Sequence, residues 1–116
     1  MSRSYKAYLL DIRDCIVKIL RYTEDYDFDH FSKDDKTIDA IVRNIEIIGE
    51  ASKHLPEEIK ELDSQIPWKA ITGMRDKLVH DYFGVDVRFV WNTVEQDIPF
   101  LNEKIESLIN KVEEEE

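Results

Sequence analysis

The chain of 116 residues contains only three glycines, three prolines and one cysteine. Glycine and proline mark the turns between short strands, so a fold built from many hairpins is not expected. The single cysteine, Cys15, excludes an internal disulfide and a metal site made of several thiols. A lone reduced thiol fits the cytoplasm, which is where we expect the protein to act.

Long hydrophobic runs and an excess of positive charge are also absent. No apolar stretch approaches the roughly 18 residues of a membrane helix, and the apolar segment near the N-terminus is too short for a signal peptide. Sixteen Lys and Arg face 26 Asp and Glu, which gives a formal net charge of −10. A broad basic surface that coats nucleic acid is therefore excluded, and any polyanion would have to meet a local patch.

The chain does contain apolar residues at steps of three and four, which predicts amphipathic helices throughout. We expect one all-α domain over residues 1–112, an antiparallel bundle of four to five helices. The block of four glutamates at residues 113–116 is expected to be a solvated acidic tail.

Two long helices are predicted in the first half of the chain. The first runs from about Ser4 to Glu24, and the second follows Ser32, whose spacing from Asp35 resembles a capping box, and ends by Pro56. Glycine on the apolar stripe of the second helix would let another helix approach closely. The expected apolar stripes consist of Tyr5, Leu9, Ile12, Ile16, Ile19 and Thr23, and of Ile38, Ile41, Val42, Ile45, Ile48 and Gly49.

Three further helices are predicted in the second half. The prolines of "PEEIKELD" and "PWKAITGMRDKLVHDYFG" suit the first position of a helix, and Gly84 is the expected stop of the latter. The last helix should begin near Asp86 and be kinked or broken just before Pro99, with Asp97 capping its second half. Its apolar seam consists of Val87, Trp91, Val94, Ile98, Leu101, Ile105, Leu108 and Val112.

The stretch "GMRDKLVHDYFGVD" carries the polar residues Arg75, Asp76, His80 and Tyr82 in a helix-forming context. On an ideal helix Arg75 and Tyr82 lie nearly on one line, whereas His80 is turned away from Arg75 by roughly 140°. The three side chains meet only if the helix loosens before Gly84, or if a second subunit completes the site across a two-fold axis. Spacing alone leaves both arrangements open.

Each of these residues also has a purely structural explanation. A histidine in the last turn of a helix is favoured by the macrodipole, and Asp76 is spaced four residues before His80 as an ion-pair partner. Arg75 could pair with one of many acids, and Tyr82 could be a core ring whose hydroxyl reaches the surface.

The motif Arg-x4-His-x-Tyr, formed by Arg75, His80 and Tyr82, resembles the signature of the HepT-like branch of the HEPN superfamily. Three segments resemble that family in order and spacing: "RNIEIIGEASKHLP", "IPWKAITGMRDKLVHDYFGVD" and "VWNTVEQDIPFL". The resemblance extends from the first helix to about Leu108. It implies a HEPN-like antiparallel helical bundle with a long, kinked C-terminal helix.

The resemblance also implies a function. Members of the HepT-like family are endoribonucleases that need no metal or other cofactor, are usually homodimers, and serve as toxins of toxin–antitoxin pairs. The antitoxin would be an MntA-type nucleotidyltransferase that silences the toxin by adding AMP to the motif tyrosine, here Tyr82. Arg75 and His80 would be catalytic, with Asp76 and Tyr82 in supporting roles, and no membrane partner is implied.

The chemistry of RNA cleavage agrees with these residue types. RNA supplies its own nucleophile, the 2′-hydroxyl, so a metal-free ribonuclease needs a proton acceptor, a proton donor and positive charge at the phosphate. His80 can fill either proton role, and Arg75 offers planar donors that match phosphate oxygens. Asp76 could orient His80 or form a plain surface ion pair. Two copies of His80 in a dimer could supply the acid and the base together.

A second class of function would use the same residues. The protein could be a non-catalytic dimeric module that binds a nucleotide or docks the nucleotidyltransferase, with Arg75 on a phosphate and Tyr82 as the modified group.

Other polar residues of the chain are less specific signals of function. His30 and His54 lack partners at metal-ligand spacing. A solvated, ion-paired face is expected of Arg43, Glu46, Glu50 and Lys53, and a local RNA-binding patch could be formed by Lys69, Lys77 and Arg88.

Overall fold

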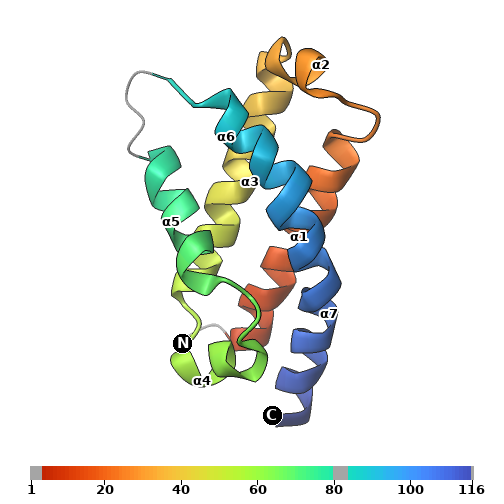
Figure 1. The fold of residues 1–116 in the computed structure, drawn as a ribbon. Helices are drawn as coiled ribbons and strands as arrows, with labels where there is room; N and C mark the ends of the chain where they lie inside the picture. The colour runs from red at the N-terminus through yellow and green to blue at the C-terminus, as the bar shows by residue number, and fades with distance from the viewer. Residues whose placement is uncertain (1–3, 80–83, 116) are drawn as a thin grey trace.

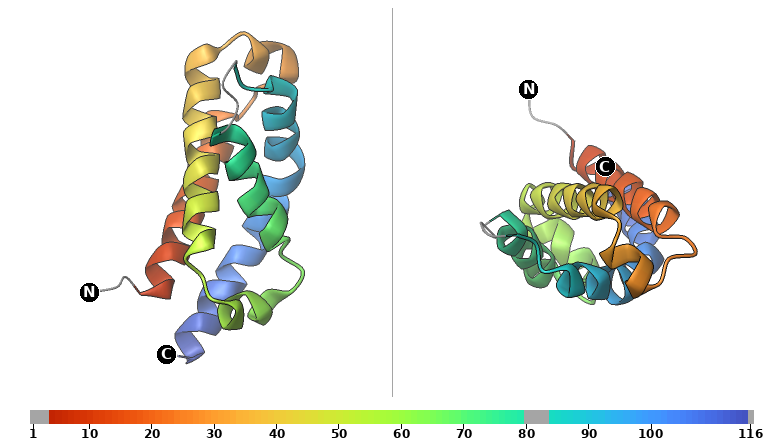
Figure 2. Two further views of the ribbon diagram at one scale, coloured as in Figure 1. Left: turned by 90° about the vertical axis from the view of Figure 1, so that its left-hand side faces the viewer. Right: turned by 90° about the horizontal axis from the view of Figure 1, so that it is seen from above.

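The protein is a bundle of helices that run up and down against one another (Figures 1 and 2). The computed structural model describes residues 4–79 and 84–115, and no strand occurs within these ranges. The longer elements are α1 (Tyr5–Tyr22), α3 (Asp35–Lys53), α5 (Trp68–Val79), α6 (Val87–Asn92) and α7 (Ile98–Glu115). Two short helices, α2 (Phe28–Ser32) and α4 (Glu57–Lys60), connect them. The predicted all-α antiparallel bundle is confirmed.

Helix α1 begins and ends close to the predicted residues. The Ser4 hydroxyl accepts a hydrogen bond from the Ala7 N–H at 3.2 Å and caps the helix. The predicted stripe is buried from Leu9 to Thr23, but Tyr5 is 42% exposed. One turn at the start of the helix therefore lies beyond the core.

The connection from α1 to α3 differs from the prediction. It contains the extra helix α2, which Asp27 caps, and Ser32 is the last residue of that helix. The cap of α3 is Asp34, whose carboxylate accepts a hydrogen bond from the Thr37 N–H at 3.1 Å. The predicted capping box at Ser32 and Asp35 is therefore wrong. The Asp34 carboxylate satisfies the first turn of α3 instead, and Ser32 donates to the Asp29 carbonyl.

Pro56 and Pro67 were predicted to be the first residue of a helix, but each lies one position before the helix begins. Pro56 is the N-cap of α4, and α5 begins at Trp68, directly after Pro67. Gly84 has a φ of 126°, a conformation that glycine adopts most easily. The helix end expected at Gly84 involves residues 80–83, which lie outside the described part of the chain.

The last helix passes through Pro99 without a break. Helix α6 begins directly after Asp86, as predicted, and the Asp86 side chain caps it. A π-helical segment, Thr93–Asp97, joins α6 to α7. In that segment the Ile98 N–H bonds to the Thr93 carbonyl, a wider turn than the α-helical one. Asp97 lies inside this turn and caps no new helix, so that part of the prediction is wrong. The helix changes direction here rather than ending (Figure 2).

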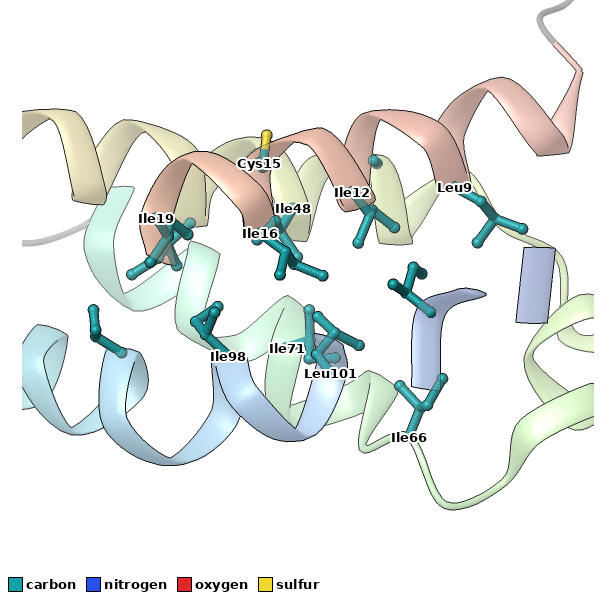
Figure 3. Close-up of a cluster of buried hydrophobic side chains, with 14 of the residues drawn as sticks. Leu9, Ile12, Cys15, Ile16, Ile19, Ile48, Ile66, Ile71, Ile98 and Leu101 are labelled. Carbon is teal, nitrogen blue, oxygen red and sulfur yellow. The ribbon is translucent and has the colours of Figure 1, made fainter. Parts of the chain in front are cut away.

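The apolar seam of α6 and α7 is used inside the chain itself. Every predicted seam residue from Trp91 to Val112 is buried, and α7 packs along α1. Figure 3 shows Ile16 of α1 facing Ile98 and Leu101 across the core. The seam therefore offers no face to a second subunit. The end of α7 includes Glu113, which pairs with Lys6 at 2.7 Å.

Candidate active site around Arg75

The site is built where α5 crosses α3. Gly49 is buried on α3 and faces α5. A Cβ atom at Gly49 would overlap Arg75 Cβ and lie 2.9 Å from Arg75 Cγ and 3.4 Å from the Ile71 carbonyl oxygen. The close approach predicted from this glycine is confirmed. It places the base of Arg75 directly on the backbone of α3.

The guanidinium of Arg75 is held by two carboxylates. Its Nη2 lies 3.2 Å from Glu50 Oε2 on α3, and its Nη1 lies 3.1 Å from Asp76 Oδ1. The side chain is 27% exposed, so one part of the group is packed and another part reaches solvent. A phosphate approaching from solvent would meet a cation whose position is already restrained.

Asp76 belongs to the same network of charges. Its Oδ1 also lies 2.9 Å from Lys53 Nζ, which extends from the last turn of α3. The hydrogen bond from Lys53, followed by the one from Arg75, lowers the pKa of Asp76. Asp76 is therefore ionised at neutral pH and bridges α3 to α5. Asp76 is thus ion-paired with Lys53 and Arg75, while a role of Asp76 in orienting His80 stays a prediction.

A groove opens beside Arg75 on the face formed by α1, α3 and α5. Its volume is about 490 Å³. Two of its lining rings, Tyr8 of α1 and His54 at the end of α3, are stacked with centroids 4.8 Å apart and planes 7° from parallel. The lining consists of Tyr8, Asp11, Arg43, Glu46, Ile47, Glu50, Ala51, His54 and Arg75.

Glu50 connects the groove to the arginine. Its Oε1 lies 3.7 Å from His54 Nε2, while its Oε2 pairs with Arg75. The sequence interpretation of a solvated ion-paired face holds for Arg43 and Glu46, which lie 4.0 Å apart. It missed that Glu50 and Lys53 reach across to α5. The signal available in the sequence was their closeness to Gly49, the residue that allows α5 to come close: Glu50 follows it directly and Lys53 is four residues after it.

The three cations of the expected RNA-binding patch are all exposed. Lys77 Nζ lies 5.1 Å from the ring centre of Phe89, and the Arg88 guanidinium lies 3.5 Å from that of Phe28. Lys69 is eight residues before Lys77 on α5, which corresponds to roughly 12 Å along a helix. In the sequence, Lys77 comes three residues before the 80–83 segment and Arg88 five residues after it, whereas Lys69 is more distant.

The remaining motif residues, His80 and Tyr82, lie outside the described part of the chain. Their placement relative to Arg75 therefore stays a prediction. Within residues 4–79 and 84–115, no group of three or more His, Cys, Asp and Glu side chains is arranged to hold a metal ion. Over the same ranges, no helix has the length and apolar character needed to cross a bilayer.

Comparison with known proteins places this arrangement in a family. The family described as "Ribonuclease HepT-like" matches residues 12–108, which include the α3–α5 crossing and the whole Arg-x4-His-x-Tyr motif. The chain belongs to the HepT-like ribonuclease family. This family is a branch of the HEPN superfamily, so the predicted membership is confirmed.

Two relatives of this HepT-like protein span nearly its whole length. A "Probable ribonuclease HepT" from Thermococcus cleftensis is 51% identical over 93% of this chain and 98% of its own. A protein of Methanocaldococcus jannaschii named "Putative RNase MJ0125" is 41% identical over 97% of each chain. No solved structure matches the chain.

Proposed function

We propose that this HepT-like protein is a metal-independent endoribonuclease and the toxin of a toxin–antitoxin pair. The observation that supports this most directly is the restrained guanidinium of Arg75, which lies at the edge of an open groove in a chain of a ribonuclease family. Arginine remains charged at any physiological pH and matches phosphate oxygens with two parallel donors. Arg75 is therefore assigned to the scissile phosphate.

The reaction needs two proton transfers. The 2′-hydroxyl oxygen attacks the phosphorus and loses its proton to a base, the bond from phosphorus to the 5′-oxygen breaks, and an acid protonates that oxygen. His80 is assigned to one of these transfers, and His80 of a second subunit would supply the other. The products would be a 2′,3′-cyclic phosphate and a 5′-hydroxyl end. Asp76 keeps Arg75 oriented through its ion pair.

The test is RNA cleavage by the purified protein in EDTA. Wild-type protein should cleave RNA and leave 2′,3′-cyclic phosphate ends, while Arg75→Ala and His80→Ala should lose cleavage and cellular toxicity. Both variants should keep the circular dichroism spectrum and a nearly unchanged Tm, since the ion pairs of Arg75 involve half-exposed acids. Variants that stay fully active would overturn the catalytic assignment.

Silencing of the toxin is assigned to Tyr82. An MntA-type nucleotidyltransferase partner would transfer AMP from ATP to the Tyr82 hydroxyl and release pyrophosphate. The added phosphate is negative and would pair with an arginine such as Arg75, and the nucleoside would fill space that RNA needs. Charge and occupancy together would block cleavage.

Intact-mass and peptide mass spectrometry test this regulation. Incubation with the partner, ATP and magnesium should add one or more adenylate units to Tyr82 and suppress cleavage, and Tyr82→Phe should resist both effects. Adenylate on a different residue, or full silencing of the Phe variant, would contradict it. Adenylation of Tyr82 in a protein that never cleaves RNA would instead favour the non-catalytic docking module.

A further inference from the structure

The groove beside Arg75 has a chemical character unlike that of a phosphate site. Its charged side chains include three carboxylates, those of Asp11, Glu46 and Glu50, against the two cations Arg43 and Arg75. Both cations already face a carboxylate, because Arg75 Nη2 lies 3.2 Å from Glu50 Oε2 and Arg43 Nη1 lies 4.0 Å from Glu46 Oε2. A second phosphate would be repelled from the interior of the groove. A neutral group attached to a phosphate at Arg75 could enter the groove without this repulsion.

The stacked rings indicate which neutral group fits. Tyr8 and His54 come from different helices, lie nearly parallel, and both line the groove. The His54 side chain is 50% exposed. Unpaired RNA bases stack on tyrosine and histidine rings in single-strand recognition, because every base has a flat π-face. The volume of about 490 Å³ is within the range of small-ligand sites, about 300–1,000 Å³.

The Glu46 carboxylate indicates which of the four bases the groove would bind. Glu46 is a carboxylate acceptor with 28% of its side chain exposed, and its Oε2 is at 4.0 Å from Arg43 Nη1, the limit of an ion pair. A carboxylate has two acceptor oxygens and no donor, so it prefers a base edge with two adjacent donors. Guanine offers N1–H and N2–H₂ side by side. Adenine, cytosine and uracil each place an acceptor next to their donor on that edge.

From these contacts we infer that the groove between α1, α3 and α5 is a nucleobase subsite, which binds a guanine of the RNA substrate next to the phosphate at Arg75. His54 and Tyr8 form the stacking platform, and Glu46 reads the guanine edge. The inference names the substrate preference of the proposed ribonuclease and rests on that function. Binding, however, can be measured without any cleavage.

The experiment is titration of the full chain with 5′-GMP, 5′-AMP, 5′-CMP, 5′-UMP and inorganic phosphate, followed by NMR or calorimetry. GMP should bind at least about fivefold more tightly than the other nucleotides. His54→Leu should weaken GMP binding roughly tenfold, because one of the two stacked rings is lost. His54→Phe keeps a ring without an ionisable group and should keep most of the affinity, which separates stacking from a charge effect. Glu46→Gln should remove the preference for guanine and leave phosphate binding unchanged.

His30→Leu is the matched control for the histidine variants. His30 also lies beside a carboxylate, with its Nδ1 2.6 Å from Asp27 Oδ1, but it belongs to α2 at the far end of the bundle (Figure 1). It should leave nucleotide binding unchanged. Equal binding of all four nucleotides, or binding that does not respond to His54→Leu and Glu46→Gln, would overturn the inference. The inference would also be overturned if the protein bound no nucleotide and His54→Leu changed the molecular mass of the particle in solution. That result would assign the groove to a contact between subunits.

Mapping of RNA cleavage sites separates this inference from the proposed function. Cleavage next to guanine that loses its base preference in Glu46→Gln supports both. Cleavage without base preference, unchanged in Glu46→Gln, supports the ribonuclease and rejects the subsite. GMP binding with the expected variant pattern in a protein that cleaves no RNA supports the subsite and rejects the ribonuclease.

Discussion

Arg75 is held by its chain neighbour Asp76 and by two adjacent residues of α3, Gly49 and Glu50, which lie 26 and 25 residues earlier in the sequence. Gly49 lies against its Cβ, Glu50 pairs with one terminal nitrogen, and Asp76 pairs with the other. Asp76 accepts a hydrogen bond from one terminal nitrogen of the planar guanidinium and Glu50 forms an ion pair with the other, an arrangement that a single lysine ammonium cannot reproduce. The residue type is therefore specified by the surroundings as well as by the proposed chemistry.

Arg75→Lys tests this specification. We expect a large loss of RNA cleavage with little change in Tm, because the charge is kept while the fork is lost. Kinetic assays on a defined RNA, beside thermal melting, would check it. Cleavage at the wild-type rate would show that a point charge is sufficient.

Cys15 is a residue whose chemistry is suppressed by its position. It is 5% exposed, and burial raises the pKa of its thiol to about 11. Because the thiolate is the reactive form, the native protein should resist a thiol-modifying reagent at pH 8 and react fully only after unfolding. Intact-mass measurements with and without guanidinium chloride check this prediction. Rapid labelling of the native chain would show that α1 opens easily.

At the scale of elements, the crossing of α3 and α5 depends on a missing side chain. Gly49→Ala would force a methyl group into Arg75 Cβ and against the Ile71 carbonyl, so the helices would have to separate. We expect destabilisation of about 1–3 kcal/mol, typical of overpacking, together with a loss of cleavage as Arg75 moves. Urea unfolding and the RNA assay measure the two effects.

Gly73 provides the matched control on α5. A Cβ atom there would meet nothing within 4 Å. Gly73→Ala should therefore stabilise the protein by roughly 0.5–1 kcal/mol, because glycine is unfavourable inside a helix. If both alanine variants behaved alike, the close approach at Gly49 would not be the cause.

The start of α3 carries a pH-dependent contribution to stability. Hydrogen bonds from Tyr26, at 2.6 Å, and from Thr37 lower the pKa of the Asp34 carboxyl in the folded protein. A carboxyl whose pKa is lowered by folding stabilises the protein above its unfolded pKa, and that contribution is lost as the pH falls through the folded pKa. Asp34→Asn keeps a capping group without the charge. Its Tm should lie below that of wild type at pH 7, and the two should converge below about pH 4. A Tm difference that is the same at every pH would contradict this account.

At the scale of the whole molecule, the apolar seam of the last helix cannot be the contact between two subunits. The seam residues from Trp91 to Val112 are buried against the chain's own helices. Two reasons to expect a homodimer remain: the resemblance to the HepT-like family, and the need to bring a second His80 to the site. A dimer would therefore use surfaces around the α3–α5 crossing.

Light scattering tests this assembly. The chain has a mass of 13.8 kDa, and we expect a particle of twice that mass at micromolar concentration. Mixing Arg75→Ala with His80→Ala should restore part of the activity if each site combines residues of two subunits. A monomer with full ribonuclease activity would rule out the shared site.

The sequence by itself determined the local structure of this protein. Helical periodicity predicted α1, α3, α5 and one long last helix, which the structure divides into α6 and α7, and a glycine on an apolar stripe predicted a close crossing, because both follow from the repeat of a single helix. The flanking segments of the Arg-x4-His-x-Tyr motif indicated the family. These signals act over a few residues and need no knowledge of which helix meets which.

Only the tertiary structure decided what surrounds Arg75. Tyr8 stacks on His54, and Glu50 and Lys53 reach α5, through contacts between residues distant in the chain. Periodicity assigns such residues to an exposed face but does not say which neighbouring helix borders that face. The same holds for Asp34 at the start of α3 and for the π-helical turn before Pro99. Asp34 also accepts a hydrogen bond from the Tyr26 hydroxyl at 2.6 Å, and Thr93 and Val94 of the π-helical turn are buried, and neither contact follows from the repeat of a single helix.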